Sequence, residues 1–112
     1  MAIHCDEYNG VRVLILDGDL SGAVAAEVQR LCDQRLTGPN ATSFVLDLGQ
    51  CDYVDSAGLE MLCRVRRSCH EVGSRLVFAR VGPNVARILQ VTRLAARFDH
   101  YPSLASAVSA AR

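Results

Sequence analysis

The chain has 112 residues, of which 50% are apolar and 21% are charged, a composition typical of a soluble globular domain. Its 12 Lys and Arg residues balance its 12 Asp and Glu residues, so the basic excess typical of nucleic-acid-binding domains is absent. No apolar run reaches the roughly 18 residues that a membrane-spanning helix requires, and residues 1–6 lack the features of a signal peptide. We therefore expect one domain over residues 1–112, located in the cytoplasm, that neither binds nucleic acid nor inserts into a membrane.

The first third of the chain predicts a β-hairpin followed by a helix. Residues 2–7 and 11–16 form two apolar runs, and Asn9-Gly10 between them is a strong signal for a tight hairpin turn. The next segment predicts a helix that Ser21 caps and that runs to about Leu36, where Gly38-Pro39 ends it. The spacing of its apolar residues favours one buried helix face.

The centre of the chain predicts a buried strand and a long amphipathic helix. Phe44 to Leu48 is almost entirely apolar, as is typical of a central strand that is covered on both faces. A helix from about Ser56 to Val72 follows, with Gly73 at the position after its last turn. Its predicted core stripe consists of Leu62, Val65, Cys69 and Val72.

The last third predicts two further strands and two further helices. We expect a strand at Arg75–Val81, a helix from Pro83 to about Thr92 or Leu94, a short strand at Arg97–Asp99 and a last helix at Leu104–Ala111. The order is therefore β-β-α-β-α-β-α-β-α. Alternating strands and helices after an opening hairpin predict an α/β domain with a mixed, mostly parallel sheet of four or five strands and about four helices.

The cysteines and histidines give no sign of a disulfide framework or a metal site. The cysteines are odd in number and without a Cys-x-x-Cys pair, so we expect buried reduced thiols. They are Cys5, Cys32, Cys51, Cys63 and Cys69. The histidines His4, His70 and His100 show no ligand spacing, and we assign no metal.

The segment Asp55-Ser56-Ala57-Gly58 places a hydroxyl and a carboxylate at the start of the long helix. A serine there caps the helix or accepts a phosphate, because the free N–H groups of the first turn favour an anion. Ser56 lies outside a Gly-x-Ser-x-Gly elbow, and no histidine is placed by the sequence to activate it. We therefore predict a binding protein without catalytic residues or a cofactor, although Asp47 and Asp52 join Asp55 in a possible carboxylate cluster.

The chain resembles the STAS domain family over nearly its whole length. The strand Val45–Leu48 followed by Asp55-Ser56-Ala57-Gly58-Leu59 carries the most specific part of the resemblance. Gly18-Asp19-Leu20 is similar to the family's Gly-Glu-Leu turn, and Val81-Gly82-Pro83-Asn84-Val85 to its later helix entry. Ser21 stands where the family usually has Asp, and Ala57 where its best-known antagonists have Ser or Thr.

The resemblance implies an anti-sigma factor antagonist that works by partner switching. The unphosphorylated protein would bind an anti-sigma factor that is a serine kinase and so release a sigma factor. Phosphorylation of Ser56 would end this binding, and a phosphatase would reset the protein. The partner surface implied by the resemblance and the helix pattern consists of Asp19, Ser21, Asp52, Asp55, Ser56, Ala57, Gly58, Leu59 and Met61.

Other interpretations of the same residues remain open. The chain could be a STAS accessory subunit of an ABC-type lipid transport complex, or a scaffold or nucleotide-sensing STAS domain. Gly58 could serve a partner contact or a close helix contact. Either Leu59 or Met61 is expected to be an exposed interface anchor, because neither lies well on the core stripe. Arg64, Arg66, Arg67 and His70 suggest a basic patch, but pairing with Glu60 and Glu71 favours a solvated face.

Overall fold

The computed structural model describes residues 3–36 and 42–112, and the predicted helix end at Gly38-Pro39 lies outside them. Within these ranges the strands are β1 (Ile3–Tyr8), β2 (Val11–Asp17), β3 (Ser43–Gln50), β4 (Leu76–Ala79) and β5 (Asp99–Tyr101). The helices are α1 (Gly22–Asp33), α2 (Ser56–Glu71), α3 (Pro83–Val91) and α4 (Leu104–Ala111), with a short 3-10 helix, η1 (Ala95–Arg97). The predicted α/β architecture with a mixed sheet is confirmed.

The sheet has the strand order β1-β2-β3-β4-β5, in which only the β1–β2 pair is antiparallel. Asn9 and Gly10 form the expected turn between them with φ values of 52° and 80°, the left-handed conformation that a type I′ turn requires. In the centre, Leu46 on β3 pairs with Leu14 on β2 and Phe78 on β4. This register aligns the apolar faces of the three central strands.

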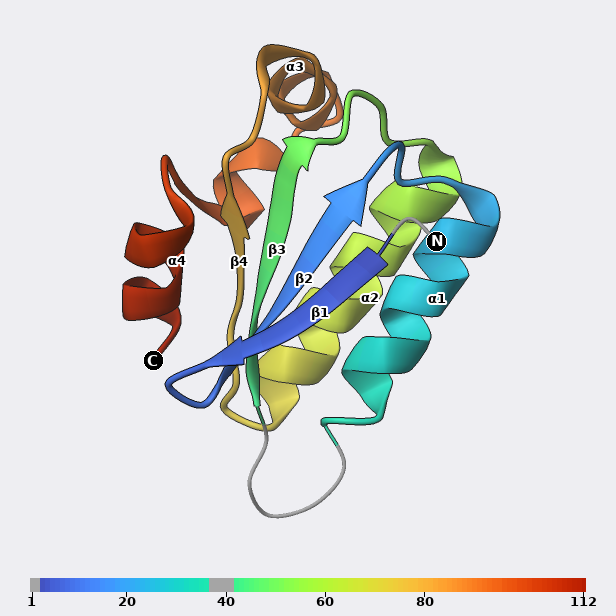
Figure 1. Ribbon diagram of the computed structural model, residues 1–112. Helices are drawn as coiled ribbons and strands as arrows, with labels where there is room; N and C mark the ends of the chain where they lie inside the picture. Colours follow the sequence, from blue (N-terminus) through green and yellow to red (C-terminus); the bar gives the residue numbers. More distant parts are fainter. Residues whose placement is uncertain (1–2, 37–41) are drawn as a thin grey trace.

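Two hydrophobic cores lie on opposite faces of the sheet. One contains the buried residues of α1, α2 and α3, and the other those of α4. Figure 1 shows α1 and α2 side by side and α4 on the opposite side of the strands. Alternation along β3 explains the division, since Leu46 faces the first core and Val45 the second. The buried residues of α2, which run from Gly58 to Cys69, therefore pack along most of the helix.

Some predicted boundaries are wrong. The residues expected to form a strand at Arg97–Asp99 include the end of η1, and β5 begins at Asp99 instead. Phe98, in the middle of that range, is buried and stacks on Phe78 with ring centroids 4.7 Å apart. α1 ends at Asp33 rather than near Leu36. Val72 is 46% exposed and not part of the core stripe, because α2 ends at Glu71 and the 3.6-residue period stops there.

All five cysteines are free thiols, but they differ in burial. Cys32, Cys51 and Cys69 are buried, and this burial raises the pKa of each thiol. Cys5 is exposed, so the prediction that it is buried is wrong. It lies on β1, which is an edge strand of the sheet.

Candidate functional site

The loop that follows β2 and the loop that follows β3 lie side by side at one end of the sheet. The Leu20 N–H donates to the Tyr53 carbonyl at 2.9 Å, and the Asp55 N–H donates to the Leu20 carbonyl at 3.2 Å. Leu20 and Val54 form a parallel β-bridge, and both are buried. These contacts bring Asp19 and Ser21 to the start of α2, although more than thirty residues separate them in the chain. Figure 1 shows the beginnings of α1 and α2 at this same end of the molecule.

Asp55 joins the beginnings of the two helices. Its Oδ1 accepts a hydrogen bond from the Gly58 N–H at 2.8 Å, which caps α2. Its Oδ2 accepts from the Gly22 N–H at 3.3 Å, at the first residue of α1. Ser21 occupies the N-cap position of α1 but forms no capping bond through its side chain, so the prediction that its hydroxyl caps the helix is wrong. The carboxylate of Asp55 therefore accepts a hydrogen bond from the first turn of both helices.

Gly58 allows α2 to approach the loop after β2 closely. A Cβ atom at this position would lie 2.5 Å from the Leu20 carbonyl oxygen and 2.8 Å from Val54 Cγ1. Distances this short require the backbone to move, and Gly58 itself is buried. Of the two roles considered for Gly58, the structure assigns it the close packing contact.

Ser56 is exposed at the first residue of α2. Because Asp55 is the cap, the alternative that Ser56 caps this helix is wrong. The Ser56 hydroxyl forms no hydrogen bond with any residue that the structure describes. We define the α2 entry surface as the exposed residues Asp19, Asp52, Tyr53, Ser56 and Ala57. It carries carboxylates and no cationic side chain.

Tyr53 is the one member of this surface that was not predicted from the sequence. Its side chain is 53% exposed, while Cys51 two residues before it and Val54 directly after it are buried. The Cys51 thiol donates to the Tyr53 carbonyl at 3.4 Å, so the backbone beneath the ring is held in place. The sequence signal was available, because a lone aromatic residue between two aspartates in a short loop is an exposed anchor candidate.

The two apolar residues after Gly58 are not equally accessible. Met61 is 1% exposed and belongs to the core, so it presents no surface to a partner and the expectation that it does is wrong. Leu59 is partly buried and packs against the same core. The first turn of α2 thus exposes only small or polar side chains, Ser56 and Ala57, beside the tyrosine.

Asp47 takes no part in the site. It is 1% exposed, and the Arg80 side chain donates to it through Nε at 3.0 Å and Nη2 at 2.8 Å. The Gly49 N–H donates to the same carboxylate at 2.9 Å. The carboxylate raises the pKa of the Arg80 guanidinium through these hydrogen bonds. The carboxylate cluster suggested by Asp47, Asp52 and Asp55 therefore does not form around Ser56.

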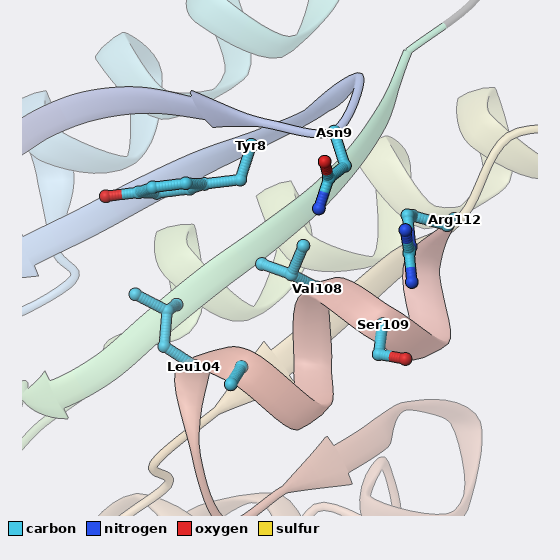
Figure 2. A pocket seen from close by; sticks show the side chains of 7 residues that line it. Tyr8, Asn9, Leu104, Val108, Ser109 and Arg112 are labelled. Carbon is cyan, nitrogen blue, oxygen red and sulfur yellow. The ribbon is translucent and has the colours of Figure 1, made fainter.

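A cavity of about 470 Å³ lies away from Ser56, between the β1–β2 turn and α4. Figure 2 shows Tyr8 and Asn9 on one side of it, and on the other Leu104 and Val108 of α4 with Arg112, which follows the helix. None of the predicted site residues lines it. Across the described ranges, no three His, Cys, Asp or Glu side chains gather where they could hold a metal ion. None of the helices in those ranges has the length and hydrophobicity needed to cross a membrane.

Comparison with known proteins identifies a family for this arrangement. The family model of the STAS domain matches residues 2–107. A sequence relative is the "Putative anti-sigma factor antagonist BtrV" of Bordetella bronchiseptica. It is 29% identical over 93 residues, which are 82% of this chain and 78% of the relative.

Solved structures show the same fold at lower sequence identity. A Thermotoga maritima protein described as a "putative anti-sigma factor antagonist" superposes with a TM-score of 0.86 at 19% identity, covering 98% of this chain and 94% of that one. The phosphorylated form of the Bacillus cell fate determinant SpoIIAA gives 0.77 at 15%, covering 99% and 100%. A sulfate transporter family protein of Wolinella succinogenes gives 0.80 at 18%, covering 93% and 86%. These likenesses establish the fold.

Proposed function

Because the chain belongs to the STAS domain family, we propose that it is an anti-sigma factor antagonist. Its unphosphorylated form binds an anti-sigma factor that is also a serine kinase, and this binding releases a sigma factor in the cytoplasm. The kinase phosphorylates Ser56, the complex dissociates, and a separate phosphatase restores the binding form. The relative from Bordetella bronchiseptica supports this assignment through its name.

The accessibility of Ser56 is the observation that carries the proposal. The hydroxyl is exposed and is not engaged by the described residues, because the neighbouring Asp55 already caps α2. A kinase can therefore reach the hydroxyl without uncapping the helix. The first-turn N–H groups lie beside the modified oxygen, and they favour a negative charge at that position.

Charge explains why phosphorylation would end the binding. A phosphate adds about −1.5 to −2 charges at pH 7. It would join the carboxylates of Asp19 and Asp52 on an α2 entry surface that has no cation. A partner that packs on this surface would have to bury the added charge, which costs on the order of several kcal/mol when no cation pairs with it. Dissociation then requires no refolding of the domain.

Affinity capture from a lysate of the native cells tests the proposal. The baits are the wild type, Ser56→Ala, Ser56→Asp and Ser109→Asp, and mass spectrometry identifies the captured proteins. Ser109 is an exposed serine of α4, so its substitution controls for an added carboxylate elsewhere on the surface. We expect a serine kinase with every bait except Ser56→Asp.

Phosphorylation itself is then measured with the captured kinase and ATP. We expect one phosphate on the wild type and on Ser109→Asp, none on Ser56→Ala, and loss of the complex once the wild type is modified. Capture of a transport ATPase by the wild type and Ser56→Asp alike would overturn the proposal and favour the accessory-subunit alternative.

A further inference from the structure

The exposed face of α2 has a cationic cleft toward its other end, about ten residues from Ser56. Cys63, Arg66, Arg67 and His70 line it, and their spacing of three, four and seven residues places them on one face of the helix. Arg97 of η1 completes the lining. The volume is about 130 Å³. A water molecule needs roughly 15 Å³ of such space, so the cleft has room for a group larger than one water.

The positive charge of this cleft is not neutralised by neighbouring carboxylates. Of the two helix ion pairs expected from the sequence, Glu60–Arg64 forms at 3.8 Å, but no Arg67–Glu71 pair forms. Arg67 and the side chain of Arg97 have no hydrogen-bond or ion-pair partner among the described residues. Three guanidinium groups therefore surround a space whose lining contains no carboxylate.

The backbone of η1 holds one of these arginines in place. Arg66 Nε donates to the Arg97 carbonyl at 2.6 Å, which leaves both terminal nitrogens of its guanidinium without a protein acceptor in the described residues. A guanidinium fixed in this way loses less conformational entropy on binding, and its terminal nitrogens suit the oxygens of a phosphate. Attraction to the negative end of the α2 helix dipole would explain why His70 and Arg67 lie near the end of this helix. It would not explain why η1 contributes a further arginine to the same cleft.

The adjoining cleft does not cancel this charge. It has a volume of about 200 Å³ and shares Arg66, His70 and Arg97 with the first. Its one carboxylate, Asp99, is bound by Arg75 Nη2 at 2.8 Å. The arginines shared by the two clefts thus keep their capacity to bind an anion.

We propose that the cleft between α2 and η1 is a binding site for the phosphate group of a small molecule, formed by Arg66, Arg67 and Arg97. The small volume of the cleft suits a compact oxyanion, and bidentate contacts from arginine suit its tetrahedral oxygens. This inference is independent of the proposed function, because it uses neither Ser56 nor the α2 entry surface.

Titration of the full chain with pyrophosphate, followed by two-dimensional ¹H–¹⁵N NMR at constant ionic strength, tests the site. We expect saturable shifts in the amides and arginine Nε groups of residues 63–70 and 95–97. Arg67→Gln and Arg97→Gln should each weaken binding about tenfold, since each removes a charge-assisted contact. Neither side chain has a partner in the described structure, so both variants should fold. Arg87→Gln, an exposed arginine of α3, is the matched control and should change the affinity by less than about twofold.

Three results would overturn the proposal. These are shifts centred on residues 56–59 at the α2 N-terminus, equal weakening by Arg87→Gln, and no saturable binding in the millimolar range. A parallel titration with GTP identifies the recognised group. If GTP and pyrophosphate bind with equal affinity, and Arg67→Gln and Arg97→Gln weaken both equally, the site recognises the phosphate group alone. GTP binding that is insensitive to Arg67→Gln and Arg97→Gln contradicts the site.

Discussion

The double role of Asp55 predicts that its side chain stabilises the domain more than any other carboxylate of the α2 entry loop. Replacement by alanine removes the cap on Gly58, and such a loss costs about 1 kcal/mol. It also removes the longer bond from Gly22, which is exposed and contributes about 0.5 kcal/mol. We therefore expect Asp55→Ala to lower the free energy of unfolding by about 1.5 kcal/mol.

Two further variants separate the contribution of the cap on Gly58 to stability from the other contributions of the Asp55 side chain. Asn is as good an N-cap as Asp, so Asp55→Asn keeps the bond to Gly58. Its single side-chain oxygen cannot also accept from the Gly22 N–H, so it loses that bond together with the favourable charge near two helix N-termini, about 0.5–1 kcal/mol in all. Asp52→Ala is the control, because Asp52 is exposed on the same loop and forms no hydrogen bond or ion pair with the described residues. A surface change of this kind alters stability by less than about 0.5 kcal/mol.

Urea denaturation followed by circular dichroism measures these differences. A loss of about 1.5 kcal/mol also corresponds to a fall in Tm of about 6 °C for a domain of this size. The reasoning is refuted if Asp55→Ala is as stable as Asp52→Ala. Equal losses in Asp55→Ala and Asp55→Asn would show that the charge and the Gly22 bond, and not the cap on Gly58, are responsible.

Three other substitutions give separate predictions. Gly58→Ala should destabilise the domain by about 1–2 kcal/mol in urea denaturation, although the same change inside an ordinary helix stabilises, because the new methyl group collides with backbone. Arg80→Ala should cost about 3 kcal/mol by the same measurement, because it leaves the buried carboxylate of Asp47 without its cation. Tyr53→Ala should weaken binding of the captured kinase at least about tenfold in calorimetry, whereas Tyr8→Ala, on a half-exposed tyrosine away from the site, should not.

Each of these predictions has a result that contradicts it. A stabilised Gly58→Ala protein would mean that α2 does not pack against the Leu20 carbonyl. A loss below about 0.5 kcal/mol in Arg80→Ala would mean that water reaches the Asp47 carboxylate. Unchanged kinase affinity in Tyr53→Ala, or equal weakening in Tyr8→Ala, would remove the tyrosine from the partner surface.

The residues of the candidate site show where sequence reasoning works. Asp55, Ser56 and Gly58 could be selected because a helix start has local requirements for an acceptor, a hydroxyl and a small residue. Their individual roles could not be assigned in the same way. Whether Ser56 or Asp55 caps α2 depends on the path of the preceding loop, which is set by its bridge to Leu20. The burial of Met61 likewise depends on how α2 lies on the sheet.

The sequence by itself determined the order of strands and helices, the hairpin turn at Asn9-Gly10 and the start of α2, because these follow from periodicity and turn chemistry within short segments. Only the tertiary structure decided that Arg80 pairs with Asp47 and that Arg97 joins Arg66 at the cationic cleft. Both contacts span about thirty residues of chain, and they exist because packing on the sheet brings separate elements together. The pattern of residues within a short segment carries no information on contacts between segments so far apart in the chain. The net charge around Asp47 or the cationic cleft is therefore known only when the folded structure shows which arginines lie beside it.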